Sequence, residues 1–230
     1  MLELKEVTKA FNRVRVVDEF SSVIKDEQVT GIIGPNGAGK TTLINLISGM
    51  HNLDGGSIHL DGERIDRLKA FQLARKGVGR TFQIPKPFGK MTVFENLSVP
   101  MIAVKGEADE AVIEKTLRLI TLDRLRDLPA GKLSGGQQKL LEFGRVLVVN
   151  PKLILLDEPT AGVHPTLRRT IVELIEGLKD RITVVVSHDI NFIQRTCKSV
   201  IVMNAGRKLI EGTPDVLRDE VVVEAYMGRR

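Results

Sequence analysis

A glycine-rich segment that ends in a lysine and two threonines has residue types suited to binding a nucleoside triphosphate. It follows an apolar run at residues 29–33 and consists of Gly34, Pro35, Asn36, Gly37, Ala38, Gly39, Lys40, Thr41 and Thr42. Glycines let backbone N–H groups converge on phosphate oxygens. Lys40 can reach the β- and γ-phosphates, and the Thr41 hydroxyl can ligate Mg²⁺. A helix that starts near Lys40 would direct its positive end at the anion. The alternative is a plain strand-to-helix turn, but Lys and Thr in this register favour a phosphate loop.

A second motif, at residues 153–158, is an apolar run that ends in Asp157 and Glu158. Side chains alternate along a strand, so the two acids need not share a role. At the carboxyl end of a parallel strand beside the phosphate loop, Asp157 can hold Mg²⁺ through water. Glu158 can then act as the general base that polarises the water attacking the γ-phosphate. The alternative is a strand that ends in solvated acids.

A third motif opens a predicted helix with Ser134, Gly135, Gly136 and Gln137. Ser134 and Gln137 have capping-box spacing, so one interpretation is simply a well-capped helix. However, glycine costs about 1 kcal/mol relative to alanine in a helix interior. The two glycines make sense if a ligand must approach the backbone closely, and a helix N-terminus with a serine hydroxyl can bind an anion. A second anion site beside a complete phosphate loop indicates ATP held between two copies of the chain.

The elements that must position these motifs follow from the hydrophobic periodicity. Strand patterns come first, helical patterns occupy the middle, and strands alternate with helices in the last third, which predicts a parallel sheet. A capping box at Thr92 and Glu95 opens the helical region, in which Val112, Leu117, Leu119 and Ile120 form a predicted apolar stripe. Asp61-Gly62 marks a hairpin. The predicted strands are 2–7, 14–24, 29–33, 57–60, 153–156, 183–186 and 200–203. Residues 92–150 are predicted to be a helical region, and further helices are predicted at 165–179 and 190–197.

Composition excludes several classes of protein. The 230 residues are 42% hydrophobic and 27% charged, which fits a chain with a real core. No stretch approaches the ~20 apolar residues that cross a bilayer, and the first five residues predict no secretory signal. The single cysteine, Cys197, excludes an internal disulfide and suits a reducing cytosol. The net charge of +5 is spread along the chain and aromatics are 4%, so no nucleic-acid partner is expected.

Together, the motifs resemble those of the ATP-binding subunits of ABC transporters, and the resemblance covers essentially the whole chain. Residues 34–42 match the Walker A motif, residues 133–138 the family signature, and residues 153–158 the Walker B motif. Gln83 matches the Q-loop glutamine and His188 the switch histidine. The first motif alone fits many NTPases, but all five in this order are specific to this family.

The resemblance implies an α/β fold: a P-loop NTPase core with a mostly parallel sheet, an N-terminal antiparallel β-subdomain and an inserted helical subdomain. Residues 1–82 and 151–230 would form the core, and residues 83–150 the helical subdomain. ATP and Mg²⁺ are the implied cofactors. Glu158, His188 and Lys40 would be catalytic, and Thr41, Gln83 and Asp157 would manage the metal. Phe11 matches the aromatic residue that stacks on adenine, unless it is simply an apolar residue of a β-hairpin.

The implied partners are a second ATPase subunit, in a homodimer or a heterodimer, and separate membrane permease subunits. The family forms a head-to-tail dimer with two ATP molecules, each held between the Walker A motif of one subunit and the signature of the other. The chain would lie at the cytoplasmic face of the plasma membrane. The loop at residues 82–91, which contains Pro85, Pro87 and Gly89, is the expected docking place for the permease.

Within the family, the chain is most similar to importer ATPases for branched-chain amino acids. The stretches 79–83, 161–165 and 211–228 carry that likeness, although His164 stands where the family commonly has Asp. Urea or amide importers and lipopolysaccharide-export ATPases share much of the pattern. Two alternatives lie outside transport, namely an ABC ATPase acting on ribosomes or DNA and an iron–sulfur assembly ATPase. The first commonly fuses two cassettes, and only one set of motifs is present here.

Overall fold

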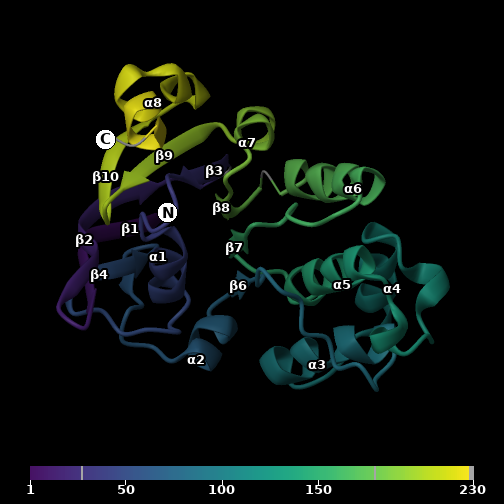
Figure 1. Ribbon diagram of the computed structural model, residues 1–230. Helices are drawn as coiled ribbons and strands as arrows, with labels where there is room; N and C mark the ends of the chain where they lie inside the picture. Colours follow the sequence, from purple (N-terminus) through teal and green to yellow (C-terminus); the bar gives the residue numbers. More distant parts are fainter. Residues whose placement is uncertain (27, 179, 228–230) are drawn as a thin grey trace.

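The computed structural model describes residues 1–26, 28–178 and 180–227, and it places two β-sheets beside a group of helices (Figure 1). The first sheet is antiparallel, with strand order β2-β1-β4-β5. Its strands are β1 (Leu2–Phe11), β2 (Val14–Ile24), β4 (Gly55–Leu60) and β5 (Glu63–Arg64). The hairpin predicted at Asp61-Gly62 is confirmed, because it joins β4 to β5.

The second sheet carries the chemical motifs. Its order is β10-β9-β3-β8-β7-β6, and all neighbouring pairs are parallel except β10 with β9. The strands are β3 (Gln28–Ile33), β6 (Val78–Arg80), β7 (Leu153–Asp157), β8 (Ile182–Val186), β9 (Ser199–Asn204) and β10 (Arg207–Gly212). Since β3 and β7 both pair in parallel with β8, their carboxyl ends meet at the same edge of the sheet.

The helices lie on both sides of this sheet. Figure 1 shows α3, α4 and α5 grouped away from the antiparallel sheet, with α6 and α7 beside the strands β7 and β8. The helices are α1 (Lys40–Ile47), α2 (Ala70–Arg75), α3 (Val93–Lys105), α4 (Glu110–Leu119), α5 (Gly135–Leu147), α6 (Pro165–Glu176), α7 (Ile190–Thr196) and α8 (Glu220–Met227); short 3₁₀ helices cover Asp123–Leu125, Ala130–Lys132 and Pro214–Arg218. Within the described ranges, no helix is both long and apolar enough to span a bilayer.

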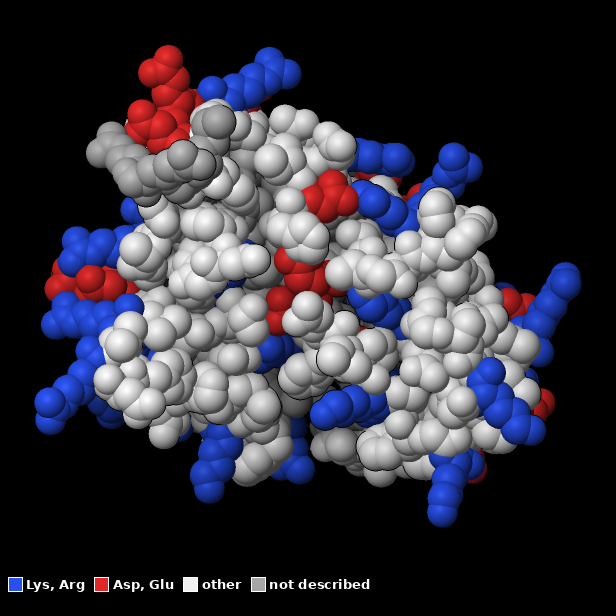
Figure 2. Space-filling view, viewed as in Figure 1, with Lys and Arg blue, Asp and Glu red and all other residues white. Residues whose placement is uncertain are grey.

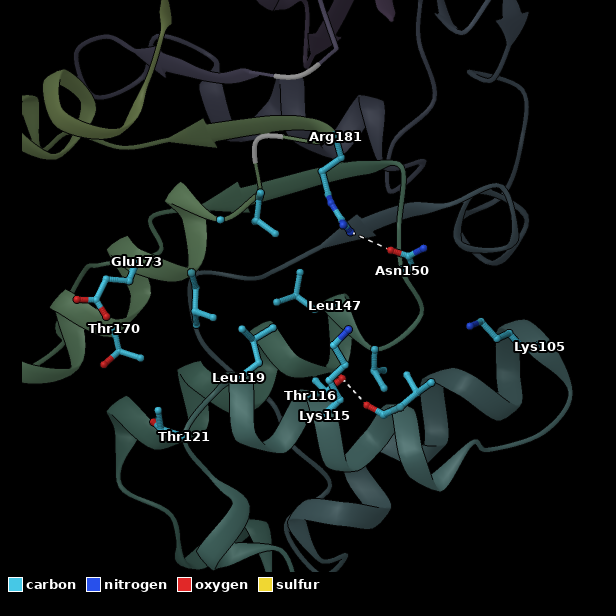
Figure 3. A pocket seen from close by; sticks show the side chains of 15 residues that line it. Lys105, Lys115, Thr116, Leu119, Thr121, Leu147, Asn150, Thr170, Glu173 and Arg181 are labelled. Atoms are coloured by element: carbon cyan, nitrogen blue, oxygen red, sulfur yellow. Dashed lines mark hydrogen bonds between the residues drawn. The ribbon is translucent and has the colours of Figure 1, made fainter.

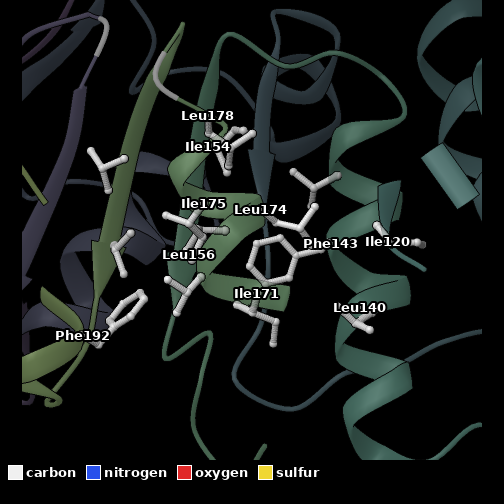
Figure 4. Close-up of a cluster of buried hydrophobic side chains, with 14 of the residues drawn as sticks. Ile120, Leu140, Phe143, Ile154, Leu156, Ile171, Leu174, Ile175, Leu178 and Phe192 are labelled. Atoms are coloured by element: carbon white, nitrogen blue, oxygen red, sulfur yellow. The ribbon is translucent and has the colours of Figure 1, made fainter. Parts of the chain in front are cut away.

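The parallel strands are apolar on both faces, and each face has its own core. Along β7, Leu153 and Leu155 belong to the cluster shared with α1 and the antiparallel sheet. Ile154 and Leu156 belong to the cluster shared with α5, α6 and α7 (Figure 4). This alternation follows from the two-residue period of a strand. The sheet is therefore covered on both sides, and the α/β fold class predicted from the sequence is confirmed.

Two details of the predicted helices are wrong or lie outside the described residues. Leu119 was expected in the apolar stripe, but its side chain is 52% exposed. Helix α4 buries Ile113, Thr116 and Leu117. A residue two positions after Leu117 points to the opposite side, because each residue turns the helix by about 100°. The helix predicted over 165–179 ends at Glu176, and its last residue, Lys179, lies outside the described residues.

Charged side chains surround the molecule without forming one continuous basic surface on the face viewed in Figure 2. Lysine and arginine side chains project in small groups around the outline, and acidic side chains lie among them and near the centre of this view. The spread of basic residues along the sequence is therefore also a spread in space on this face.

Candidate nucleotide-binding site

The phosphate loop, residues 34–42, joins β3 to α1, and two of its glycines are required by close contacts. Gly34 has φ +153°, and a Cβ atom there would lie 2.1 Å from the Met203 carbonyl oxygen. Gly39 has φ +96°, and its Cβ would lie 2.3 Å from the Val16 carbonyl oxygen. Backbone atoms cannot give way as a flexible side chain can. Any other residue would therefore displace the loop from the strands that hold it.

Lys40, the first residue of α1, folds back over this loop. Its ammonium group donates hydrogen bonds to the carbonyl oxygens of Gly34, at 2.7 Å, and Pro35, at 3.0 Å. Burial lowers the pKa of Lys40, whereas the nearby Glu158 and Asp157 carboxylates act in the opposite direction. The ammonium group is thus held at the sheet edge with two acids in range, where it can neutralise part of a phosphate's charge.

The two acids of the Walker B motif have different surroundings, as strand alternation predicts. Asp157 ends β7 and is 4% exposed. Its carboxylate lies 3.6 Å from the Arg80 guanidinium. Burial raises the pKa of Asp157, and the Arg80 charge opposes that shift. Asp157 is therefore a buried carboxylate, suited to be a metal ligand, with the Arg80 and Lys40 cations near it.

Glu158 lies just beyond the strand, with a positive φ of 48° that non-glycine residues rarely adopt. One carboxylate oxygen is 2.9 Å from His188 Nδ1, and the other accepts a hydrogen bond from the Ser187 hydroxyl at 3.3 Å. Ser187 and His188 follow β8, the strand between β3 and β7. The carboxylate is thereby oriented from two sides, as a general base must be.

A cavity of about 430 Å³ brings most of the predicted site residues together. Those that line it are Asn36, Gly37, Ala38, Gly39, Lys40, Thr41, Thr42, Gln83, Asp157, Glu158 and His188, together with Val16 and Val186. Gly34 and Pro35 do not line the cavity, but their carbonyl oxygens accept hydrogen bonds from Lys40, which does. Four segments of the predicted site, widely separated in the sequence, therefore meet around one cavity, with Val16 of β2 beside them.

The other predicted residues lie away from this cavity. Phe11 is 39% exposed at the end of β1; its ring meets His51 edge-on, and the Lys9 ammonium lies 5.4 Å from its centre. Ser134 caps α5 in the predicted capping box, in which its hydroxyl accepts from the Gln137 amide and the Gln137 side chain accepts from the Ser134 amide. Ser134, Gly135, Gly136 and Gln137 do not line the cavity of their own chain.

Sequence reasoning missed three residues that support the site. Arg80 ends β6 and donates at 2.7 Å to Ser48, the residue that follows α1, in addition to pairing with Asp157. Lys139 of α5 donates to the carbonyl oxygens of Glu158 and Ala161, which fixes the turn after β7. Ser187 orients Glu158. No local sequence pattern identifies such contacts, because the residues that they join lie at least 19 positions apart.

A larger cavity, of about 690 Å³, lies between α4, α5 and α6 (Figure 3). Apolar side chains such as Leu119 and Leu147 line it, with Lys105, Lys115 and Arg181 around them. Arg181 is already paired with Asp180. None of the predicted site residues lines this cavity, so size does not identify the chemical site.

The chemistry of the smaller cavity fits a magnesium ion with a nucleotide. A hydroxyl from Thr41, an amide from Gln83 and a carboxylate from Asp157 all face it, and hard oxygen donors of this kind suit Mg²⁺. Among the described residues, no three His, Cys, Asp or Glu side chains form a self-sufficient metal cluster. In phosphate-loop enzymes, Mg²⁺ is held jointly by a few protein oxygens and the substrate phosphates.

The chain is similar to known proteins over nearly its whole length. Residues 17–161 match the family model described as "ABC transporter". The chain is 35% identical to a probable branched-chain amino acid transport ATP-binding protein, LivG, of Archaeoglobus fulgidus, covering 99% of this chain and 95% of that protein. It is 34% identical to the high-affinity branched-chain amino acid transport ATP-binding protein BraF of Pseudomonas aeruginosa, covering 99% and 98%. It is 33% identical to the lipopolysaccharide export ATP-binding protein LptB of Escherichia coli K12, covering 99% and 97%.

Solved structures agree with these relatives. A nucleotide-free ATP-binding cassette from an ABC transporter superposes with a TM-score of 0.89 at 35% identity, covering 100% of this chain and 99% of the other. A dimeric cassette in a post-hydrolysis state, bound to ADP and phosphate, superposes with a TM-score of 0.84 at 27% identity, covering 93% and 99%.

Proposed function

Because the chain belongs to the ABC transporter family as an ATP-binding subunit, we propose that it powers the uptake of branched-chain or related amino acids through separate membrane subunits. It would work as a dimer at the cytoplasmic face of the plasma membrane. The similarity to LivG and BraF at 34–35% identity supports this choice of solute. The similarity to LptB, at 33%, supports lipopolysaccharide export as a second candidate.

The proposed hydrolysis uses residues that already lie around one cavity. The amides of the phosphate loop and the Lys40 ammonium neutralise phosphate charge. Glu158, oriented by Ser187 and His188, accepts a proton from the attacking water. Mg²⁺, when bound, would neutralise further phosphate charge, and the oxygens of Thr41, Gln83 and Asp157 are suited to hold it. His188 also lines the cavity and can contact the γ-phosphate.

The proposal that two chains share each ATP is supported by where the signature segment, residues 133–138, lies. Its helix N-terminus is suited to an anion, yet its residues do not line the phosphate-loop cavity of the same chain. A second chain in head-to-tail orientation would place this terminus against the first chain's nucleotide. A relative solved as a dimer bound to ADP and phosphate supports a dimeric working state.

The membrane partner is proposed to dock at the loop of residues 82–91, between the core (1–82 and 151–230) and a helical subdomain (83–150). The loop has no regular secondary structure and carries exposed apolar side chains: Phe82 is 47%, Ile84 70% and Phe88 44% exposed. Exposed apolar side chains that gather on one loop are typical of a protein interface. The loop also contains Gln83, so a partner bound there would act directly on the nucleotide site.

The sharing of sites is tested by two variants of the purified chain. Ser134→Arg should bind ATP normally but fail to hydrolyse it, because Ser134 lies outside its own chain's cavity. Lys40→Ala should lose nucleotide affinity. A 1:1 mixture should recover about a quarter of the wild-type rate, because half of randomly paired dimers are mixed and each has one complete site.

Thr92→Arg is the matched control, because Thr92 caps α3 in the same kind of capping box. It should lower stability by a similar amount and leave hydrolysis intact. Full hydrolysis by Ser134→Arg alone would show that one chain suffices. The solute is tested separately by reconstituting the chain with the membrane subunits encoded beside it and measuring ATP-dependent leucine uptake; stimulation by lipopolysaccharide instead would select the second candidate.

A further inference from the structure

The loop of residues 82–91 follows β6 in the chain and is hydrogen-bonded to α5 at two points. The Glu142 carboxylate accepts a hydrogen bond from the Phe82 amide at 2.7 Å. Arg145, one turn later on α5, donates to the Lys86 carbonyl at 3.1 Å, and its guanidinium lies 4.9 Å from the centre of the Phe88 ring. Residues three apart share a helix face, so one face of α5 holds both halves of the loop.

The end of the loop is tied to α3 by a fully buried asparagine. Asn96 accepts from the Phe88 amide at 2.9 Å and donates to the carbonyl oxygens of Phe88, Met91 and Thr92. The loop is thus attached to the two helices α3 and α5 by its backbone. On the β6 side, the Arg80 guanidinium lies 4.8 Å from the centre of the Phe82 ring.

Glu142 is the unusual member of this set, because it is a carboxylate that is only 8% exposed. The cations that act on it are Arg80 of β6 and its helix neighbours Lys139 and Arg145. From α2 and α3, the residues that line the same small cavity are apolar: Ala74, Pro100 and Val104. Burial raises the pKa of Glu142 to about 7, although the Phe82 amide and the three cations lower it. Keeping a carboxylate here costs solvation energy that an apolar residue would avoid.

On the premise of the proposed ATPase function, we propose that Glu142 is a positioning residue of the nucleotide site, which holds Gln83 in place through the Phe82 amide. Gln83 follows Phe82 directly and lines the cavity with Thr41 and Glu158. Glu142 is on the helix that begins at the signature segment, about 12 Å along its axis from Ser134. In the proposed dimer, α5 would therefore contact, at its N-terminus, the nucleotide bound by the other chain and set the position of Gln83 beside its own chain's nucleotide.

The ionised form of Glu142 makes the stronger hydrogen bond, because a charged acceptor binds an amide more tightly than a neutral one. Above pH 7 the carboxylate is mostly ionised and holds the loop firmly. As the pH falls through about 7, the group binds a proton and the contact weakens. Hydrolysis should therefore decline towards pH 6 by a route that does not involve the residues touching the nucleotide.

The first test compares Glu142→Ala with Glu142→Gln at pH 8. Glu142→Ala should lower kcat about tenfold, since the Phe82 amide loses its partner, while ATP affinity stays within about twofold. Glu142→Gln, whose amide oxygen can accept the same hydrogen bond, should restore most of the rate. Glu114→Gln is the control, because Glu114 is a partly buried glutamate of α4 that pairs with Arg126 and is not among the residues that line the nucleotide cavity; it should behave as wild type.

Two readouts separate positioning from a merely structural role. Hydrogen exchange at the Phe82 amide should speed up in Glu142→Ala and stay slow in Glu142→Gln. The ratio of the wild-type rate to the Glu142→Gln rate should fall as the pH drops from 8 to 6, because the Glu142 carboxylate is the one ionisable group in which the two proteins differ. This comparison remains usable if Glu142→Ala does not fold.

A normal kcat in folded Glu142→Ala, or a rate ratio that stays constant between pH 6 and 8, overturns the inference. Failure of the wild-type chain to hydrolyse ATP would instead refute the proposed function. The two failures are therefore distinguishable in one set of assays.

Discussion

Gly135 and Gly136 are the first two residues of α5, but their surroundings differ. A Cβ atom at Gly136 would lie 2.4 Å from Leu167 Cδ1 of α6, whereas a Cβ at Gly135 would meet nothing within 4 Å. Gly136 is therefore explained by packing within the chain. Gly135 is not, and under the proposed sharing of ATP its open backbone is the part of the signature segment that a second chain's nucleotide would approach.

Gly135→Ala should consequently separate stability from activity. Alanine in place of glycine favours a helix by roughly 0.5–1 kcal/mol in its interior and by less at its first turn. At about 2–4 °C per kcal/mol for a chain of this size, the Tm should rise by about 1–2 °C. ATP hydrolysis should nevertheless fall at least about tenfold, because a methyl group would keep the phosphate away from the helix amides. The measurements are thermal unfolding and steady-state ATPase activity on the same preparation.

Gly136→Ala is the matched control. Pushing Leu167 aside costs about 1 kcal/mol, which offsets the helix-propensity gain that this variant shares with Gly135→Ala, so the Tm should stay level or fall by about 1–2 °C; Leu167→Ala in the same chain should relieve that clash. Gly135→Ala that hydrolyses ATP at the wild-type rate would refute the reasoning, because the open side of the helix would then face no ligand. A large loss of Tm in Gly135→Ala would contradict the open surroundings of that residue.

Three further outcomes are expected. Glu158→Gln should bind ATP, accumulate as an ATP-bound dimer and lose about 10²–10⁴ in turnover, the usual contribution of a general base; steady-state hydrolysis at the normal rate would exclude Glu158 from that role. Asn96→Ala should lower the free energy of unfolding by about 2 kcal/mol, because it leaves buried backbone groups of the loop unpaired, and a calorimetric Tm within 1–2 °C of wild type would contradict this. Cys197 is buried, and burial raises its pKa to about 11, so a thiol-specific reagent at pH 8 should label it only after denaturation, as mass spectrometry would show.

Features that depend on neighbours in the chain could be predicted from the sequence. The phosphate loop, the acids that end β7 and the capping boxes at Thr92 and Ser134 are each contained in a few consecutive residues. Strand and helix periods and the alternation of elements likewise predicted the α/β fold, because hydrophobic periodicity reports which face of an element is buried. Two predictions about the helices were wrong. Leu119 was placed on the buried face of its helix but lies on the exposed side of α4, and α6 ends earlier than its apolar pattern predicted.

The sequence by itself therefore determined the phosphate loop, the acidic strand end and the order of elements, since local spacing carries those signals. Only the tertiary structure decided which side chains support them. The Phe82 amide meets Glu142 across 60 residues, Arg80 meets Ser48 across 32, and Leu167 of α6 comes to rest over Gly136. Such contacts depend on how sheets and helices dock, which is a property of the whole packed core rather than of any segment.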